Sequence, residues 1–160
     1  WKFNNLEKVL EKLCNFFTLM RNNPPGIPIR YIGQEQGVMA IADADQITQV
    51  FTNIVKNAMQ AMQGQENGDI IIILKSQGIQ QKNASGHTTS DWIEISISDN
   101  GPGIPAEVRE KIFVPNFTTK NTGAGLGLPI SKNIIEGAGG KIRFQTSDAG
   151  TTFYLYLKKI

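Results

Sequence analysis

The chain has 160 residues, 40% of them hydrophobic and 19% charged, a composition typical of a single globular domain spanning 1–160. A formal net charge of only +2, without a basic cluster, argues against a nucleic-acid-binding surface. No signal peptide is recognisable, and the longest apolar run, 70–74, is far shorter than the roughly 20 residues of a membrane-spanning helix, so no direct membrane insertion is expected.

A first helix is predicted to begin near the N-terminus and to end at the Asn-Asn-Pro-Pro-Gly sequence of 22–26. Asn4 with Glu7 three residues later has the pattern of a capping box. Apolar residues then recur at helical spacing: Leu6, Val9, Leu10, Leu13, Phe17 and Met20. Cys14 lies among them and is interpreted as a buried thiol. As a single cysteine it cannot form an internal disulfide, which fits a reducing compartment such as the cytoplasm.

The following segments alternate between strand and helix patterns without a strict βαβ order. Predicted strands are 27–31, 38–42, 69–76, 91–99, 141–146 and 151–157, and predicted helices are 45–62 and about 129–136. Two pairs of these strands read as hairpins, one joined by a polar connection at 77–90 and one turning at 147–150. We therefore expect an α+β fold: a two-layer sandwich with one mixed, mostly antiparallel sheet and helices on one face.

The helix predicted at 45–62 has two distinct stripes. Its apolar stripe consists of Ile47, Val50, Phe51, Ile54, Ala58 and Met62. A polar stripe contains Asn53 and Asn57, whose i, i+4 spacing places both amides on one face. Amide oxygens are suitable ligands for Mg²⁺, which also takes phosphate oxygens and water. The alternative is a pair of solvated asparagines on an exposed face.

The strand predicted at 91–99 ends in an acidic residue that should point inward. Its isoleucines alternate with Glu94, Ser96 and Ser98, which should point away from the core. By the same alternation Asp99 lies on the isoleucine side, where a carboxylate is costly without a hydrogen-bond partner. The glycines that follow it would let the backbone approach a ligand closely. Alternatively, 99–101 is simply a turn that Asp99 caps.

A second glycine cluster at 123–127 leads directly into the predicted helix near Pro129. Helix N-termini offer unpaired N–H groups and a positive dipole end, so this entry could hold phosphate groups. It is not the phosphate loop that ends in Gly-Lys-Ser/Thr, and no strand leads straight into it as a dinucleotide fold requires. A flexible linker remains the alternative.

Taken together, five motifs stand in a fixed order along the chain. They are Asn-Ile-Val-Lys-Asn-Ala at 53–58, Asp-Asn-Gly-Pro-Gly-Ile at 99–104, Lys-Ile-Phe at 111–113 with Phe-Thr-Thr-Lys at 117–120, Gly-Ala-Gly-Leu-Gly-Leu at 123–128 and Gly-Thr-Thr-Phe at 150–153. The series resembles the conserved boxes of the ATP-binding catalytic domain of sensor histidine kinases, and the residues within the motifs are most similar to those of the nitrogen-regulation branch. That family has the Bergerat (GHKL) fold shared with gyrase, mismatch-repair ATPases and related chaperones. The resemblance covers nearly the whole chain.

On the base side, the resemblance implies that Asp99 accepts a hydrogen bond from the adenine amino group. Thr151 would help to hold the same ring edge. Gly101 and Gly103 would let the base approach the backbone, and Ile104 would contact the nucleotide.

On the phosphate side, the resemblance implies that Asn57 binds Mg²⁺ and that Asn53 acts beside the phosphates of ATP. The residues that would wrap the phosphates are Gly123, Gly125, Leu126, Gly127 and Leu128. Many kinases of the family have a lysine three residues after the metal-binding asparagine, where this chain has Gln60. Lys120 is the candidate replacement, because a lysine ammonium can act as a point charge on phosphate.

The segment 105–122 would form the ATP lid in this family. Phe113 and Phe117 would anchor it, although Phe113 fits an ordinary core position equally well. The only histidine, His87, lies in a polar loop and lacks the acidic neighbour and helical setting of a phosphoacceptor.

The related hydrolysing ATPases have a glutamate where this chain has Asn53. A neutral amide cannot deprotonate water, so the resemblance implies slow hydrolysis and phosphoryl transfer to a histidine instead. The acceptor helices would belong to a longer parent protein, and a response regulator would receive the phosphate. This domain would be cytoplasmic, and the sequence leaves open whether the parent is anchored in the inner membrane. The alternatives are a serine kinase of the anti-sigma type and a nucleotide-binding regulatory module without transfer activity.

Overall fold

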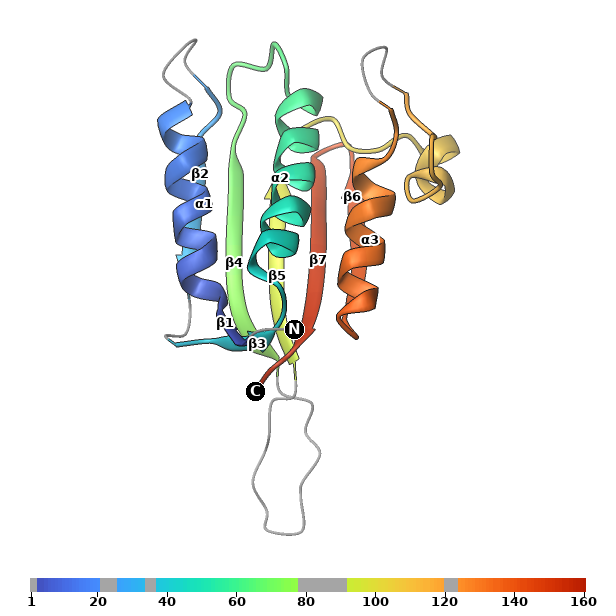
Figure 1. Ribbon diagram of the computed structural model, residues 1–160. Coiled ribbons are helices and arrows are strands. Elements are labelled where there is room, and N and C mark those ends of the chain that lie inside the picture. The colour runs from blue at the N-terminus through green and yellow to red at the C-terminus, as the bar shows by residue number, and fades with distance from the viewer. Residues whose placement is uncertain (1–2, 21–25, 34–36, 78–91, 120–123) are drawn as a thin grey trace.

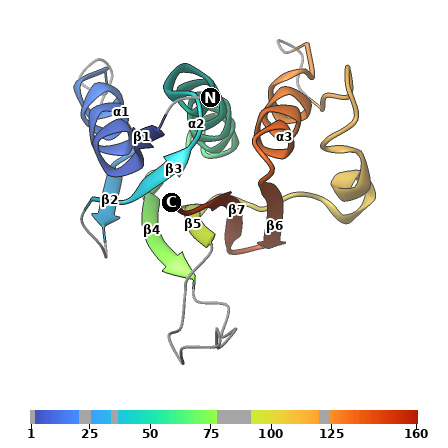
Figure 2. The ribbon, with the colours of Figure 1, turned by 60° about the horizontal axis from the view of Figure 1, so that its bottom comes forward.

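The computed structural model describes residues 3–20, 26–33, 37–77, 92–119 and 124–160. Three helices cover one face of a five-stranded sheet whose strand order is β2-β4-β5-β7-β6 (Figures 1 and 2). The helices are α1 (Leu6–Met20), α2 (Ala44–Ala61) and α3 (Gly127–Gly137), with a short 3₁₀ helix η1 (Ala106–Lys111). The strands are β1 (Phe3–Asn5), β2 (Ile29–Gly33), β3 (Met39–Ile41), β4 (Ile70–Gln77), β5 (Trp92–Asp99), β6 (Lys141–Ser147) and β7 (Gly150–Lys158).

The sheet is mixed and mostly antiparallel, as the sequence predicts. Only β2 and β4 pair in parallel, whereas β4–β5, β5–β7 and β6–β7 are antiparallel. Both predicted hairpins are confirmed, although the connection between β4 and β5 lies largely outside the described residues. The expected α+β, two-layer architecture is therefore correct.

The start of α1 differs from the prediction. Its cap is Asn5, whose Oδ1 accepts a hydrogen bond from the backbone N–H of Lys8 at 3.1 Å. The helix begins at Leu6, so the residue directly before it, the N-cap, is Asn5 and not Asn4. Glu7 does not complete a capping box either, since its Oε2 accepts from the N–H of Gly37 at 2.9 Å. The capping box expected from Asn4 and Glu7 is thus wrong: the capping residue is Asn5, and Glu7 contacts Gly37 instead of the helix N-terminus.

The core lies between the sheet and the helices. α2 lies over the middle of the sheet and buries an apolar stripe of Ile47, Val50, Phe51, Ile54, Val55 and Ala58. The isoleucines of β5 are almost fully buried. Asp43 caps α2 by accepting hydrogen bonds from the N–H groups of Asp45 and Gln46. This packing fixes the polar stripe of α2 relative to the end of β5.

The uncovered face of the sheet is less exposed than expected around β5. Glu94 alternates with the inward isoleucines as predicted, yet it is only 3% exposed. It is flanked by its cross-strand neighbours Lys75 and Tyr156, and the Lys75 ammonium lies 3.0 Å from its Oε1. An opposite charge at this distance offsets part of the cost of burying the carboxylate.

Cys14 is buried in α1 at 6% exposure, as predicted, and burial raises the pKa of its thiol to about 11. Because the thiolate is the reactive form, we expect a maleimide or disulfide reagent at pH 8 to modify the native domain about 100-fold more slowly than a free thiol. Reaction at full rate should appear only on unfolding in urea. Rapid labelling of the folded domain would show that α1 opens locally.

Among the described residues, no helix combines the length and apolar character needed to cross a bilayer.

Candidate functional site

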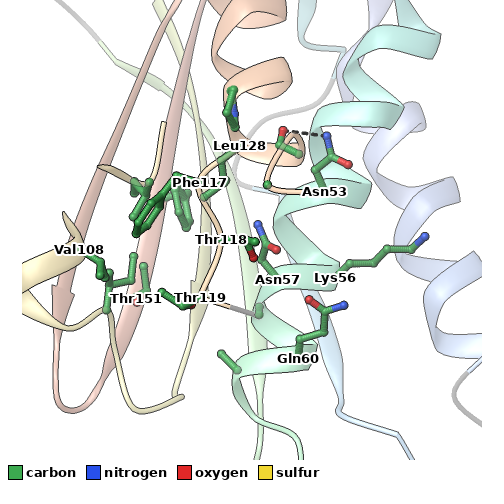
Figure 3. Close-up of a pocket in the computed structure, with 18 of the residues that line it drawn as sticks. Asn53, Lys56, Asn57, Gln60, Val108, Phe117, Thr118, Thr119, Leu128 and Thr151 are labelled. Atoms are coloured by element: carbon green, nitrogen blue, oxygen red, sulfur yellow. Dashed lines mark hydrogen bonds between the residues drawn. The ribbon is translucent and has the colours of Figure 1, made fainter. Parts of the chain in front are cut away.

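A cavity of about 420 Å³ lies at the end of the sheet where β5 ends and β7 begins. α2 and the start of α3 form one side, and β7 and η1 the other (Figure 3). The predicted site residues that line it are Asn53, Asn57, Asp99, Gly103, Ile104, Gly125, Leu126, Gly127, Leu128 and Thr151. Lys120 and Gly123 lie outside the described residues.

Gly101 is a predicted site residue that does not line the cavity. It is buried, and a Cβ at this position would lie 3.0 Å from Asp99 Oδ1 and 3.2 Å from Met62 Cγ. Its backbone N–H donates to Asp99 Oδ1 at 2.9 Å. Gly101 therefore shapes the turn that holds Asp99, and its role in letting a bound base approach the backbone stays a prediction.

Asp99 is on the inward side of β5, as strand alternation predicts, and it also caps its own turn. Its Oδ1 accepts hydrogen bonds from the N–H groups of Gly101 and Thr151, the latter at 3.3 Å. Its Oδ2 has no hydrogen bond to another residue in the described part of the chain, and Asp99 is one of the residues that line the cavity. Burial raises the pKa of Asp99, and the two backbone N–H groups oppose that shift. The residue thus offers a partly desolvated acceptor to a ligand.

The cavity walls near Asp99 are apolar, which the sequence analysis missed. Val108 and Ile112 come from η1 and the residue after it, Phe153 from β7 and Ala61 from the end of α2. A short 3₁₀ segment has no extended periodicity, so no pattern marks Val108 as a lining residue. Apolar walls around one polar acceptor suit a flat, partly polar ring system.

Asn53 connects α2 to the first turn of α3. Its Nδ2 donates to the carbonyl of Gly127 at 3.0 Å and to Ser131 Oγ at 3.2 Å (Figure 3). A solvated asparagine is therefore the wrong interpretation of Asn53. Asn57 lies one turn later, half-buried in the cavity wall, and points to the same side as Thr118 (Figure 3). Lys56, which the sequence analysis passed over, borders the cavity but extends away from Phe117 and Thr151.

The start of α3 faces the cavity without a side-chain cap. Leu126 occupies the N-cap position, whereas the equivalent position of α2 is capped by Asp43. Pro129 needs no N–H partner in the first turn. An uncapped helix start with its positive dipole end toward a cavity is suited to bind an anion.

The second glycine cluster is more than a flexible linker. Gly125 has a φ of +67°, and a Cβ there would lie 2.4 Å from the carbonyl oxygen of Phe117. The N–H of Asn116 donates to the carbonyl of Gly125 at 3.1 Å. Only a glycine lets the segment after η1 cross so closely over the entry to α3.

The two phenylalanines expected to anchor a lid, Phe113 and Phe117, both have defined partners. Phe113 packs partly buried on the core, with its ring centroid 6.1 Å from that of Phe144, and Lys132 lies 5.5 Å from its ring. Phe117 lines the cavity, and Lys111 lies 5.9 Å from its ring centroid. Phe113 is therefore a core contact that fixes this segment to β6, and Phe117 is the residue nearer the ligand space.

Comparison with known proteins gives a consistent result. Residues 42–160 match the family model described as histidine kinase-, DNA gyrase B- and HSP90-like ATPase. The chain is 37% identical to the sensory histidine kinase/phosphatase NtrB of Vibrio alginolyticus over 96% of this chain and 43% of that protein. It is 38% identical to the C4-dicarboxylate transport sensor protein DctB of Rhizobium meliloti over 77% of this chain and 18% of that protein. The chain thus spans less than half the length of these curated relatives.

Solved structures show the same architecture. The catalytic domain of the histidine kinase ThkA, in a nucleotide-free form, superposes with a TM-score of 0.80 at 31% identity, covering 99% of this chain and 95% of that one. A second structure, ThkA in complex with the response regulator protein TrrA, has a TM-score of 0.76 at 29% identity and covers 99% of this chain and 42% of that one.

Proposed function

The chain belongs to the family of histidine kinase-, DNA gyrase B- and HSP90-like ATPases, and on that premise we propose that it is the catalytic domain of a sensor histidine kinase. It binds Mg²⁺-ATP and transfers the γ-phosphoryl group to a histidine on a separate acceptor domain, as part of a two-component system. A kinase-type nucleotide site needs a place for the base and a place for the phosphates, and the cavity offers both.

The observation that carries this proposal is the pairing of Asp99 with the open start of α3 across one cavity. Asp99 Oδ2 accepts a hydrogen bond from the amino group of adenine, between the apolar side chains of Val108 and Phe153. The uncapped N-terminus of α3, entered through Gly125, takes the phosphates. Thr151 and Ile104 border the base end of the same space.

The metal ligand in this proposal is Asn57. Its amide lines the cavity between the base end and α3, and amide oxygens suit Mg²⁺. No group of three or more His, Cys, Asp or Glu side chains within the described ranges could hold a metal on its own. A metal bound through Asn57 therefore depends on phosphate oxygens and water for most of its ligands. When bound, Mg²⁺ offsets the negative charge that builds up on the phosphates during transfer.

Asn53 favours transfer over hydrolysis. Its Nδ2 must donate to the Gly127 carbonyl and to Ser131, and a carboxylate at this position could not donate to a carbonyl. The amide also cannot take a proton from water. Asn53 thus holds the phosphate-binding helix start in place while the acceptor histidine supplies the nucleophile, and hydrolysis by the domain alone is slow. Lys120 is proposed to place its ammonium on the terminal phosphate, in place of a lysine at position 60.

The partners follow from the same proposal. Transfer breaks the bond between the γ-phosphorus and the β–γ bridging oxygen and forms a phosphorus–nitrogen bond to the acceptor imidazole. That imidazole belongs to acceptor helices of the parent kinase, and a response regulator then takes the phosphoryl group. The ThkA–TrrA complex supports this order of partners by analogy.

The deciding experiment mixes this chain with the acceptor helices of its parent kinase and γ-labelled ATP. We expect Mg²⁺-dependent label on histidine, recognised by its lability in acid. Asn57→Ala should lower the labelling rate by about 100-fold, because the metal loses its protein ligand. Gln49→Ala is the matched control: Gln49 is an exposed residue of α2, one turn before Asn53 and outside the cavity, and this variant should label at the wild-type rate.

The alternatives give different outcomes. Stable ATP binding without any transfer would indicate a regulatory module. Acid-stable label on a serine of a partner protein would indicate a serine kinase of the same fold. Equal labelling by Asn57→Ala and wild type would remove Asn57 as the metal ligand.

A further inference from the structure

Thr146 of β6 lies directly behind the base end of the cavity. The register of the sheet places Asp99, Thr151 and Thr146 opposite one another on three adjacent strands. Directly paired residues on neighbouring strands point to the same face. Asp99 and Thr151 line the cavity, whereas Thr146 does not. Thr146 can therefore act on a ligand only through its neighbours.

The hydroxyl of Thr146 connects two parts of the site. Its Oγ1 accepts a hydrogen bond from the backbone N–H of Ile104 at 2.8 Å, at the point where the first glycine motif leads into η1. The same atom lies 3.0 Å from Thr151 Oγ1 and 3.4 Å from the carbonyl oxygen of Gly150. Since a hydroxyl has one proton, Thr146 can donate to only one of the last two.

The distances decide which of these two accepts the proton. Hydrogen bonds between hydroxyl and oxygen groups have typical lengths of about 2.5–3.0 Å, so the 3.0 Å contact to Thr151 is the better bond and the 3.4 Å contact to Gly150 is long. If Thr146 donates to Thr151 Oγ1, the proton of Thr151 must point elsewhere. Thr151 lines the cavity, so its own proton is then available there.

We propose that Thr146 is a positioning residue that makes the Thr151 hydroxyl a hydrogen-bond donor toward the nucleotide base and thereby sets the preference for adenine. This inference rests on the proposed nucleotide-binding function. In this arrangement Asp99 Oδ2 presents an acceptor and Thr151 presents a donor, side by side. Adenine offers the complementary pair on one edge, an amino group and a ring nitrogen acceptor, whereas guanine offers a carbonyl and a ring N–H in the opposite order.

A second consequence concerns the lid. Ile104 lines the cavity, and its N–H depends on Thr146 for a partner. Arg109 of η1 in turn donates from Nε to the Ile104 carbonyl at 2.9 Å. Thr146 thus also fixes the backbone segment that leads into η1. Its loss should therefore weaken the binding of all nucleotides, in addition to its specific effect on adenine.

The test compares ATP and GTP binding to the 160-residue chain by calorimetric titration. Thr146→Val keeps the shape but removes the hydroxyl, so the Thr151 proton is no longer directed to the cavity. We expect ATP affinity to fall by about tenfold more than GTP affinity. Thr146→Ser should restore the wild-type ratio. Both titrations use aliquots of the same protein preparation, so the ratio of ATP affinity to GTP affinity does not depend on the fraction of folded protein.

Thr152→Val is the matched control. It removes a hydroxyl from the next residue of β7, which bonds Ser98 Oγ at 2.9 Å on the other face of the sheet, and the ATP/GTP ratio should not change. In Thr151→Val, adding Thr146→Val should cause little further loss of ATP/GTP discrimination, because the second hydroxyl acts through the first. An ATP/GTP ratio for Thr146→Val within about twofold of wild type would overturn the inference. Failure of the wild-type chain to bind ATP at all would instead overturn the proposed function.

Discussion

Asp99→Asn is expected to weaken ATP binding by about 100-fold, equivalent to about 2.7 kcal/mol. The amide oxygen can still accept from the N–H groups of Gly101 and Thr151, as Asp99 Oδ1 does. The amide nitrogen then occupies the place of Oδ2 and directs N–H groups at the adenine amino group. An acceptor in a charged hydrogen bond is thus replaced by a donor facing a donor. Calorimetric titration with ATP measures the loss.

The same substitution should stabilise the nucleotide-free domain at neutral pH. Burial raises the pKa of Asp99 above 3.8, so the folded state binds this proton more tightly than the unfolded state. The resulting stabilisation is complete below the ordinary pKa and is lost as pH rises through the raised folded pKa. The amide introduced by the substitution does not titrate. The melting temperature of Asp99→Asn should therefore exceed that of wild type at pH 7, and the excess should shrink as the pH falls to about 3.5.

Asp148→Asn provides the control for Asp99→Asn. Asp148 is exposed in the turn between β6 and β7, and its substitution removes the same charge from the protein without touching the cavity. We expect ATP affinity and melting temperature within error of wild type. If Asp99→Asn bound ATP as tightly as wild type, Asp99 would not be the base-recognising residue.

Gly103→Ala is expected to lower the free energy of unfolding by about 3 kcal/mol or more. Gly103 has a φ of +78°, and a Cβ there would lie 1.9 Å from the carbonyl oxygen of Ser147. The carbonyl belongs to the backbone and the position of the Cβ is fixed by the backbone, so neither can rotate aside, and the loop after Asp99 must move away from the β6–β7 turn. Because that movement takes Ile104 with it, nucleotide affinity should fall as well. Urea unfolding and ATP titration measure the two effects.

Gly139→Ala separates the clash from the cost of the backbone angle. Gly139 has a similar φ of +73°, but no atom lies within 4 Å of an added Cβ. This variant should lose only about 1 kcal/mol, the usual cost of a left-handed conformation for a residue with a side chain. Equal destabilisation of the two variants would mean that the approach of Gly103 to Ser147 is not rigid.

The inward position of Asp99 could be predicted because it needs only strand alternation, which is a local property. The hairpins β4–β5 and β6–β7 could be predicted for a similar reason, since each joins neighbouring segments. The parallel pairing of β2 with β4 could not, because the long helix α2 separates these strands and nothing in their sequences specifies the partner.

The first helix shows how a local pattern can mislead. Asn4 and Asn5 are adjacent and chemically identical, so the sequence does not specify which of them precedes the first helical residue; the structure begins α1 at Leu6, which makes Asn5 the cap. Thr146 was missed for a related reason. It is one of several polar residues on an ordinary edge strand, and its importance arises from a contact with Ile104 that lies 42 positions away.

The two ends of the described chain flank the same strand. β1 pairs with one side of β3, and Lys159 forms a bridge to Ala40 on the other, so the ends stand two strand spacings apart, about 10 Å. Thr151 is at the start of β7 and Lys159 directly follows its end, so nearly the whole length of β7, about 25 Å, separates the two chain ends from the cavity (Figure 1). A dye or affinity tag attached at one end would therefore lie close to a tag attached at the other end, and neither would obstruct the cavity.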